Sequence, residues 1–282
     1  MMYPNSFLRR ISFFLILSCF ALNSALAQPE FTAKHDSINW VDAKGMKQGK
    51  FRTVDRNGKT IDEGYYRNNK RYGTFTNFNE DGKVIAIRVF SKDGKSCQAK
   101  MFDSEGLLMG KGKYINELRD SVWLFYSADT VILKETYKAG KKNGPAVVYF
   151  HNGKIADQSV WKNGIQEGPW IQFNDNGSKR GEGNFVNGCQ DGPFIYYAGM
   201  GVKRLEANYK NCLPEGTWNY LKPNGIVERT VQYKHGDVIG GQPIDFEKML
   251  KDGLEEFKDR NDKEHGGGTT PSTDKNNDDG GY

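Results

Sequence analysis

Aromatic residues recur along this sequence at a fixed interval, between clusters of glycine, asparagine and aspartate. The interval is 24 residues, with a single step of 23 residues. Periods of this size are typical of stacked arrays in which each unit contacts only its neighbours. Counted from a glycine-like first position, the units begin at Gly49, Gly73, Cys97, Ser121, Gly144, Gly168, Gly192 and Gly216.

Three positions of the unit are apolar almost throughout. Because the third and sixth positions are three residues apart, they would point to opposite faces of a regular strand, so we expect aromatic side chains on both faces; a bulge is the alternative. The eighteenth position is aromatic in every unit: Tyr66, Phe90, Tyr114, Tyr137 (shifted by one residue), Trp161, Phe185, Tyr209 and Tyr233. The third position reads Phe51, Phe75, Ala99, Trp123, Ala146, Trp170, Phe194 and Trp218, and the sixth reads Val54, Phe78, Phe102, Tyr126, Tyr149, Phe173, Tyr197 and Leu221.

Turn residues alternate with these columns. The tenth position is usually glycine after Asn or Asp, and a second turn follows the eighteenth, as in Asn163-Gly164, Asn187-Gly188 and Asn68-Asn69. Such pairs tolerate the positive φ that tight hairpins require. The unit that is one residue short lacks the tip glycine at Ala128-Asp129, and a deletion confined to a turn leaves the columns in place.

Each unit is therefore predicted to be two short antiparallel strands. The fold class is all-β: an elongated single-layer antiparallel meander of about eight 24-residue hairpin repeats, with a short C-terminal helix. Only 37% of the chain is hydrophobic while 13% is aromatic, which argues against one large core. A single layer would be stabilised mainly by cross-strand aromatic pairs.

The turn pattern resembles that of a known repeat family. Stretches such as Glu63 to Phe75 and Gly183 to Phe194 share the order aromatic, any residue, Asn-Gly, three residues, Gly, any residue, aromatic. They resemble the MORN repeat in its bacterial variant form, over roughly residues 38–241. The resemblance implies an elongated, twisted sheet that acts as a protein-interaction or assembly scaffold. Lipid-headgroup binding is proposed for some members, and some bacterial variant proteins carry an antitoxin label.

The first 27 residues have the composition of a signal peptide. Arg9 and Arg10 precede an apolar run from Ile11 to Leu22, and cleavage is expected between Ala27 and Gln28. The run is shorter than the roughly 20 residues that span a bilayer. We expect export to the periplasm or beyond, which an intracellular antitoxin would not need. A lipoprotein anchored at Cys19 is the alternative.

The remaining boundaries follow from changes in pattern. Residues 28–48 are assigned to a linker and an N-terminal capping half-repeat, 49–241 to the repeats, 242–260 to an amphipathic capping helix and 261–282 to a disordered tail. Docking to a partner is the alternative role of the helix. Its apolar face would be formed by Phe246, Met249, Leu250, Leu254 and Phe257.

Cleavage would leave three cysteines, Cys97, Cys189 and Cys212, of which at least one is unpaired. Cys189 and Cys212 are a candidate disulfide because they fall in the equivalent turns of adjacent repeats. Equivalent points two strands apart lie about 9.5 Å from each other, beyond the roughly 7 Å Cα limit, unless the turns lean together. Three small filler residues are the alternative. The spacing indicates no zinc site.

Nothing in the sequence indicates an enzyme, a cofactor or a metal site. The four histidines, His35, His151, His235 and His265, are scattered, and the glycines follow turn positions rather than a phosphate-binding loop. The body of the chain is mildly basic and its tail acidic, but charges this dispersed in an exported protein do not favour nucleic acid as a partner.

Two functions remain open. The first is a non-enzymatic scaffold that binds another exported or envelope protein through Tyr126, Tyr149, Phe173 and Tyr197, for each of which sheet packing is the alternative role. The second is a glycan- or anionic-lipid-binding module, in which rings meet sugars or basic turns meet headgroups. A homodimer through a sheet end or face is a further alternative.

Overall fold

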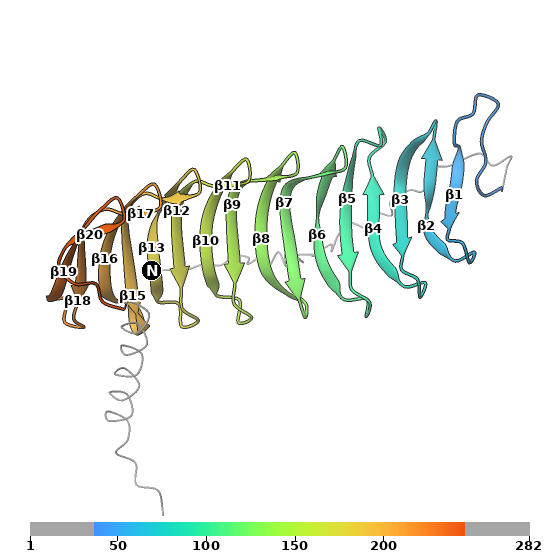
Figure 1. Ribbon diagram of the computed structural model, residues 1–282. Coiled ribbons are helices and arrows are strands. Elements are labelled where there is room, and N and C mark those ends of the chain that lie inside the picture. Colours follow the sequence, from blue (N-terminus) through green and yellow to red (C-terminus); the bar gives the residue numbers. More distant parts are fainter. Residues whose placement is uncertain (1–36, 246–282) are drawn as a thin grey trace, which may run out of the picture. The chain divides into compact units, whose positions relative to one another are not determined.

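The computed structural model describes residues 37–245, which form one antiparallel sheet (Figure 1). The N-terminal half contains β1 (Gly49–Val54), β2 (Thr60–Arg67), β3 (Lys70–Phe78), β4 (Val84–Phe90), β5 (Ser96–Phe102), β6 (Leu108–Ile115), β7 (Leu118–Ser127), β8 (Thr130–Lys138) and β9 (Lys141–Tyr149). The C-terminal half contains β10 (Ile155–Lys162), β11 (Ile165–Gln166), β12 (Gly168–Phe173), β13 (Lys179–Val186), β14 (Cys189–Gln190), β15 (Gly192–Ala198), the 3₁₀ turn η1 (Gly199–Gly201), β16 (Val202–Lys210), β17 (Leu213–Pro214), β18 (Gly216–Leu221), β19 (Val227–Lys234) and β20 (Asp237–Gly240).

Successive strands pair antiparallel when β11 and β12, β14 and β15, and β17 and β18 are each counted as one strand, so the predicted all-β meander is confirmed. The predicted signal peptide at 1–27, the disordered tail at 261–282 and most of the capping helix at 242–260 lie outside the described residues. Within residues 37–245, none of the secondary structure is a helix of the length and apolarity needed to cross a membrane.

Twenty strands replace the expected sixteen partly because a bulge divides three of them. Glu167 separates β11 from β12, and both pieces pair with β10. The next residue, Gly168, has φ 103°, and the first-position glycines Gly192 and Gly216 behave alike at φ 90° and 70°. Glycine recurs at this position because the bulge requires a backbone conformation that other residues rarely adopt.

The predicted turns are confirmed. Asn163 and Gly164 both have positive φ, at 53° and 89°, as a type I′ hairpin turn demands. In the unit that is one residue short, Ala128 and Asp129 take φ values of 45° and 62° and close a two-residue turn. The deletion is thereby absorbed at the tip, and Tyr137 keeps its place opposite the first position of its unit.

The sheet has two unlike faces. Rings of the third and eighteenth positions interlock on one of them, which we call the packed face; Phe185, for example, meets Trp170 and Phe194 edge to face. The sixth position lies on the opposite, open face: Tyr197 donates a hydrogen bond to Glu182, whose backbone pairs with Ile195. Both expected features occur, since a register shift also falls between Tyr196 and Tyr197, with the extra residue on the partner strand.

A size rule governs the packed face. The third-position rings of Phe75, Trp123 and Phe194 lie over a glycine of the preceding strand, so closely that a Cβ on Gly112 or Gly183 would overlap the ring of Trp123 or Phe194. Both rings are 0% exposed although the sheet is one layer thick. Where the third position is alanine, the residue opposite is long and charged instead: Arg88 faces Ala99, and Glu135 faces Ala146.

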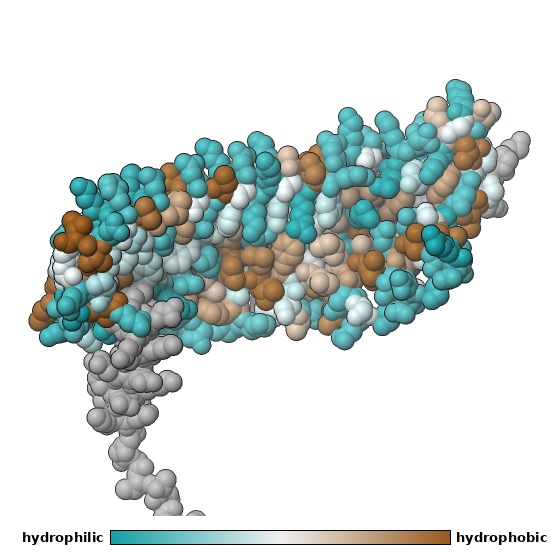
Figure 2. Space-filling view, viewed as in Figure 1, coloured by the Kyte–Doolittle hydropathy of each residue, from teal (hydrophilic) through white to brown (hydrophobic). Residues whose placement is uncertain are grey.

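The buried residues form two clusters along this face. One contains Phe194, Leu205, Ala207, Trp218, Tyr220, Val231 and Tyr233, and the other contains Ala99, Trp123 and Tyr137. Figure 2 shows one side of the sheet, where hydrophobic residues lie in a band between hydrophilic margins.

The first edge of the sheet is closed by a side chain. The amide of Asn39 donates to the Arg52 carbonyl at 3.0 Å and accepts from the Arg52 N–H at 2.7 Å, as a neighbouring strand would. The backbone N–H of Asn39 also donates to the Lys50 carbonyl. These bonds occupy edge groups that could otherwise pair with another chain.

Cys189 and Cys212 are joined by a disulfide, with their Cα atoms 4.6 Å apart, and Cys97 is a buried free thiol. The sequence estimate of their separation was too long because adjacent turns lean together. The N–H of Cys212 donates to the carbonyl of Gln190 in the preceding repeat, and other turns make the same bond, as Gly188 does to Gln166.

The size rule predicts the effect of adding one methyl group. Gly183→Ala should lower the free energy of unfolding by about 1–3 kcal/mol, the usual cost of overpacking, because the ring of Phe194 must move. Gly240→Ala is the matched control, since its Cβ would meet only the Gln232 side chain, at 3.5 Å. Urea unfolding followed by tryptophan fluorescence compares the two. Equal midpoints for the two variants would contradict the rule.

Candidate functional site

The four sequence-predicted binding residues share one face. Tyr149 and Phe173 are the last residues of β9 and β12, and Tyr126 and Tyr197 are the second-last residues of β7 and β15. All four lie on the open face and are half-buried. They differ in their partners. The Nζ of Lys111 lies 5.3 Å from the ring centroid of Tyr126, whereas the hydroxyl of Tyr197 donates to Glu182 at 2.5 Å.

A continuous row of directly opposed residues crosses the open face beside them, and we call it the open-face row. Between β6 and β16 its charged members are sorted by sign, with lysines toward β6, an uncharged glutamine in the middle and glutamates toward β16. Aliphatic residues alternate with them. From β6 to β16 the row is Lys111, Leu124, Lys134, Val147, Gln158, Ile171, Glu182, Ile195 and Glu206. Toward β1 the same register continues to the ion-paired Glu63 and Arg52.

The two glutamates of the row are held as carboxylates. Lys179 and then the Tyr197 hydroxyl lower the pKa of Glu182, and Lys203, at 2.9 Å, lowers the pKa of Glu206. Burial, followed by the hydrogen bond to Glu182, raises the pKa of Tyr197 to about 12. The Tyr197 hydroxyl is therefore protonated and engaged within the sheet at neutral pH.

The middle of the open face is apolar. Val147 and Tyr149 lie on β9, Ile171 and Phe173 lie on β12, and the uncharged Gln158 of β10 lies between Val147 and Ile171. No other described element covers this face. These side chains form an uncharged patch with lysines on one flank and paired glutamates on the other.

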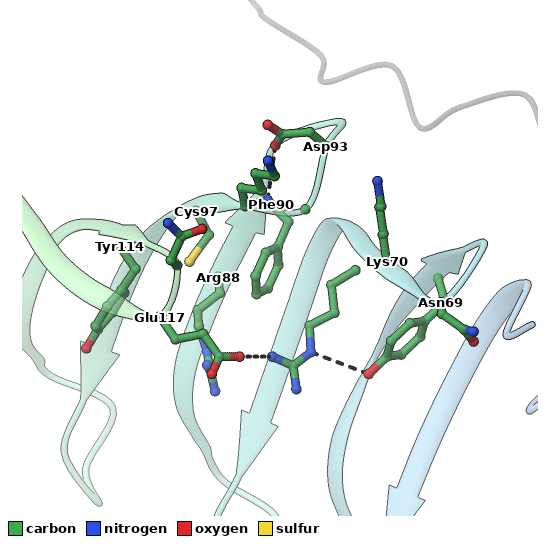
Figure 3. A pocket seen from close by; sticks show the side chains of 13 residues that line it. Asn69, Lys70, Arg88, Phe90, Asp93, Cys97, Tyr114 and Glu117 are labelled. Atoms are coloured by element: carbon green, nitrogen blue, oxygen red, sulfur yellow. Dashed lines mark hydrogen bonds and ion pairs between the residues drawn. The ribbon is translucent and has the colours of Figure 1, made fainter. Parts of the chain in front are cut away.

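The packed face contains a hollow that the sequence did not predict (Figure 3). It is a cavity of about 700 Å³. It lies where the third position is Ala99 instead of a ring and the first position is Cys97 instead of glycine. Without that glycine the β4–β5 register runs unbroken, and residues between Phe90 and Ser96 form a longer turn. Its lining residues are Tyr66, Asn69, Lys70, Arg71, Arg88, Phe90, Asp93, Gly94, Lys95, Cys97, Tyr114, Asn116 and Glu117.

Positive groups dominate the lining of this pocket. The Arg71 guanidinium donates to the Tyr66 hydroxyl at 3.4 Å and to the Glu117 carboxylate at 3.1 Å, and these contacts, Tyr66 first, raise the pKa of Arg71. Arg88 donates to the neutral amide of Asn77. Burial raises the pKa of the Cys97 thiol, which keeps it protonated.

Arg71 belongs to a column of cations that the sequence interpretation missed. The twenty-third position reads Lys47, Arg71, Lys95, Arg119 and Lys142 in the N-terminal units, then Gln166, Gln190 and Pro214. Four of the five cations lie over rings of the packed face; the guanidinium carbon of Arg119, for instance, is 4.9 Å from the Trp123 ring centroid. The change from cations to uncharged residues was the available signal.

Glu135 is the buried counterpart of this column. It accepts a hydrogen bond from Tyr137 at 2.5 Å and forms an ion pair with Lys142, while Arg119 contacts the Tyr137 hydroxyl. These partners compensate its burial, so the cluster is structural. Across residues 37–245 no group of three or more His, Cys, Asp or Glu side chains could hold a metal, and His151 and His235 lie in turns.

Comparison with protein families gives one match, at residues 166–187, to the MORN repeat variant. The repeat at residues 166–187 is a MORN repeat variant. The matched segment runs from β11 through the tip to the next Asn-Gly turn, and the other MORN-like units repeat its columns. The matched repeat indicates a repeat scaffold for protein or membrane interaction.

Two solved structures resemble this chain remotely. A crystal structure of TarM matches with a TM-score of 0.19 and 16% identity. A mutant of S. aureus TarM, in complex with Fondaparinux, alpha-GlcNAc-glycerol and UDP, matches with a TM-score of 0.20 and 16% identity. In both cases the match covers 42% of this chain and 19% of the other. Scores this low carry no argument about this protein. No curated protein matches the sequence significantly.

The Tyr197–Glu182 contact predicts a titration. Glu182→Gln should lower the pKa of Tyr197 from about 12 toward its ordinary value of 10.0, because a neutral amide no longer favours the protonated phenol. In the wild type this raised pKa contributes stability that is complete below about pH 10 and is lost as the pH rises through about 12. Tyrosine ¹³Cζ shifts followed by NMR measure the pKa. Glu63→Gln, distant on the same face, is the control and should leave the Tyr197 curve unchanged.

Proposed function

We propose that this protein is an exported, non-enzymatic scaffold of the bacterial cell envelope that binds another exported or envelope protein through the middle of its open face. The observation that carries the proposal is the apolar patch of Val147, Tyr149, Ile171 and Phe173, which no other described element covers. Uncovered apolar patches rimmed by polar residues mark interaction surfaces.

The chemistry of the patch suits a protein partner. Its centre is free of charge, as interface cores are, and charged residues of the open-face row lie at its flanks. Lys134 and Glu182 on opposite sides would orient a partner of complementary charge. The row would also complement a second copy turned by 180°, so a homodimer is one form that the partner could take.

The disulfide supports the exported location. A bond between Cys189 and Cys212 persists in oxidising compartments and is rare in the cytosol, where thiols are kept reduced. This agrees with the signal-peptide pattern before Gln28. The two observations are independent, because one comes from the sheet and the other from the N-terminal sequence.

Export predicts the form of the protein in its native cells. The N-terminus of the mature chain should be Gln28, and intact-mass and peptide mass spectrometry should find Cys189 linked to Cys212 with Cys97 free. A lipid-modified N-terminus at Cys19 would support the anchored alternative. An uncleaved chain with all four cysteines reduced would contradict export.

The binding surface predicts a face-specific crosslink. A photoreactive phenylalanine analogue in place of Tyr149 should capture one discrete protein in the native envelope, and Val147→Lys should abolish the product by placing a charge in the patch. The same analogue in place of Trp161, on the packed face, is the matched control and should give no such product. A product of twice the chain mass would identify a second copy.

Two results would refute the proposal. One is a product of equal yield from Tyr149 and Trp161, and the other is a product that survives Val147→Lys. Capture of lipid or glycan alone at Tyr149 would instead establish the alternative binding class. Thermal unfolding of each variant verifies that the sheet is intact.

A further inference from the structure

The packed-face pocket lies in one of the two repeats whose third position is alanine. In the other, Glu135 opposite Ala146 is buried, and in the repeat that follows the pocket the ring of Trp123 is 0% exposed. In the third repeat Ala99 has no ring to offer, and its neighbour Arg88 extends along the hollow instead of filling it. Phe90 and Tyr114 form apolar walls on either side (Figure 3).

Arg88 keeps hydrogen-bond donors for a ligand. Its Nε and Nη2 both donate to a single oxygen, Oδ1 of Asn77, at 3.3 Å and 2.8 Å. A guanidinium has five N–H donors in a planar fork that fits oxyanions. Among the described residues, none of the ion pairs involves Arg88.

The pocket already holds one carboxylate, at its mouth. Glu117, whose side chain is 80% exposed, pairs with Arg71 at 3.1 Å. An exposed pair of this kind contributes little stability, so an incoming anion can replace Glu117 on Arg71 at low cost. The other acid, Asp93, is engaged in its own turn with Ser91 and the Lys95 N–H.

The balance of charge is positive. Lys70 and Lys95 line the rim beside Arg71 and Arg88, against Glu117 and Asp93. We propose that this pocket binds an oxyanion, a carboxylate or phosphate group, on a small ligand whose uncharged part contacts Phe90 and Tyr114. The site lies on the face opposite the protein-binding patch, so it is independent of the scaffold function.

Titration of the isotope-labelled protein with inorganic phosphate or with glucuronate, followed at the Arg88 Nε–H signal by NMR, tests the site. At least one probe should bind saturably. Arg88→Gln should weaken that binding about tenfold or more, the loss expected for charge-assisted hydrogen bonds, and Glu117→Gln should strengthen it by freeing Arg71. For Arg88→Gln, the backbone signals of Ala99 and Phe90 replace the lost reporter.

Arg52→Gln is the charge-matched control, because Arg52 pairs with Glu63 on the open face and should not affect binding. The double variant Arg88→Gly and Ala99→Phe restores the glycine-and-ring pairing of the other repeats. It should fold with a thermal midpoint at least equal to that of the wild type and should bind neither probe. Its folding separates loss of the pocket from loss of the sheet.

The source of the anion is resolved by comparing probes. Vesicles containing phosphatidylglycerol that bind the wild type but not Arg88→Gln would identify a lipid source, and binding of the free probes alone a soluble one. The proposal is overturned if neither free probe binds, or if Arg88→Gln and the folded double variant bind as tightly as the wild type.

Discussion

An aromatic ring lying on the bare backbone of a glycine one strand away is the contact on which this sheet depends. A single layer has nothing to pack against, so burial must come from neighbours within the layer. The missing Cβ at Gly112 or Gly183 lets the ring descend until the strands themselves exclude water from it. A ring of the eighteenth position then packs edge to face against each third-position ring that lies over a glycine, as Tyr209 does against Phe194.

Where a charged residue opposite alanine replaces the glycine-and-ring contact, the packed face carries a charge. A long charged residue opposite alanine cannot exclude water in the same way, so it must be either compensated or solvated. Glu135 is compensated by Tyr137 and Lys142 and is buried. Arg88 has only a neutral amide and lies beside an open hollow. The charged residue opposite alanine thus decides the outcome: Glu135 becomes part of the buried core, and Arg88 lines a pocket.

The sequence predicted what depends on period and local conformation. Columns such as Tyr66 to Tyr233 and turns such as Asn163-Gly164 can be recognised in the sequence. Each turn residue is selected by the backbone conformation it adopts, and each column residue by the face of the sheet on which it lies. The pocket was not predictable, because Arg88 and Ala99 have meaning only as cross-strand neighbours and their register was unknown. The closeness of Cys189 to Cys212 was missed for a similar reason: strand spacing describes the middle of a sheet, whereas its turns lean together. All four predicted binding residues lie on one face in the structure. The hydrogen bond from Tyr197 to Glu182 was not predictable from the sixth-position column, because Glu182 lies outside that column on the neighbouring strand.

The side chain of Asn39 gives the array a defined beginning. It imitates a peptide group against Arg52, so the backbone N–H and C=O of Arg52 at the sheet edge are already hydrogen-bonded. Internal units can therefore be duplicated or lost while the capped start of the sheet stays the same. Each internal unit pairs only with the units on either side of it. Evolution can adjust the length of such a surface while its first boundary stays the same, and an engineer who wishes to lengthen it should insert units after Asn39 rather than before it.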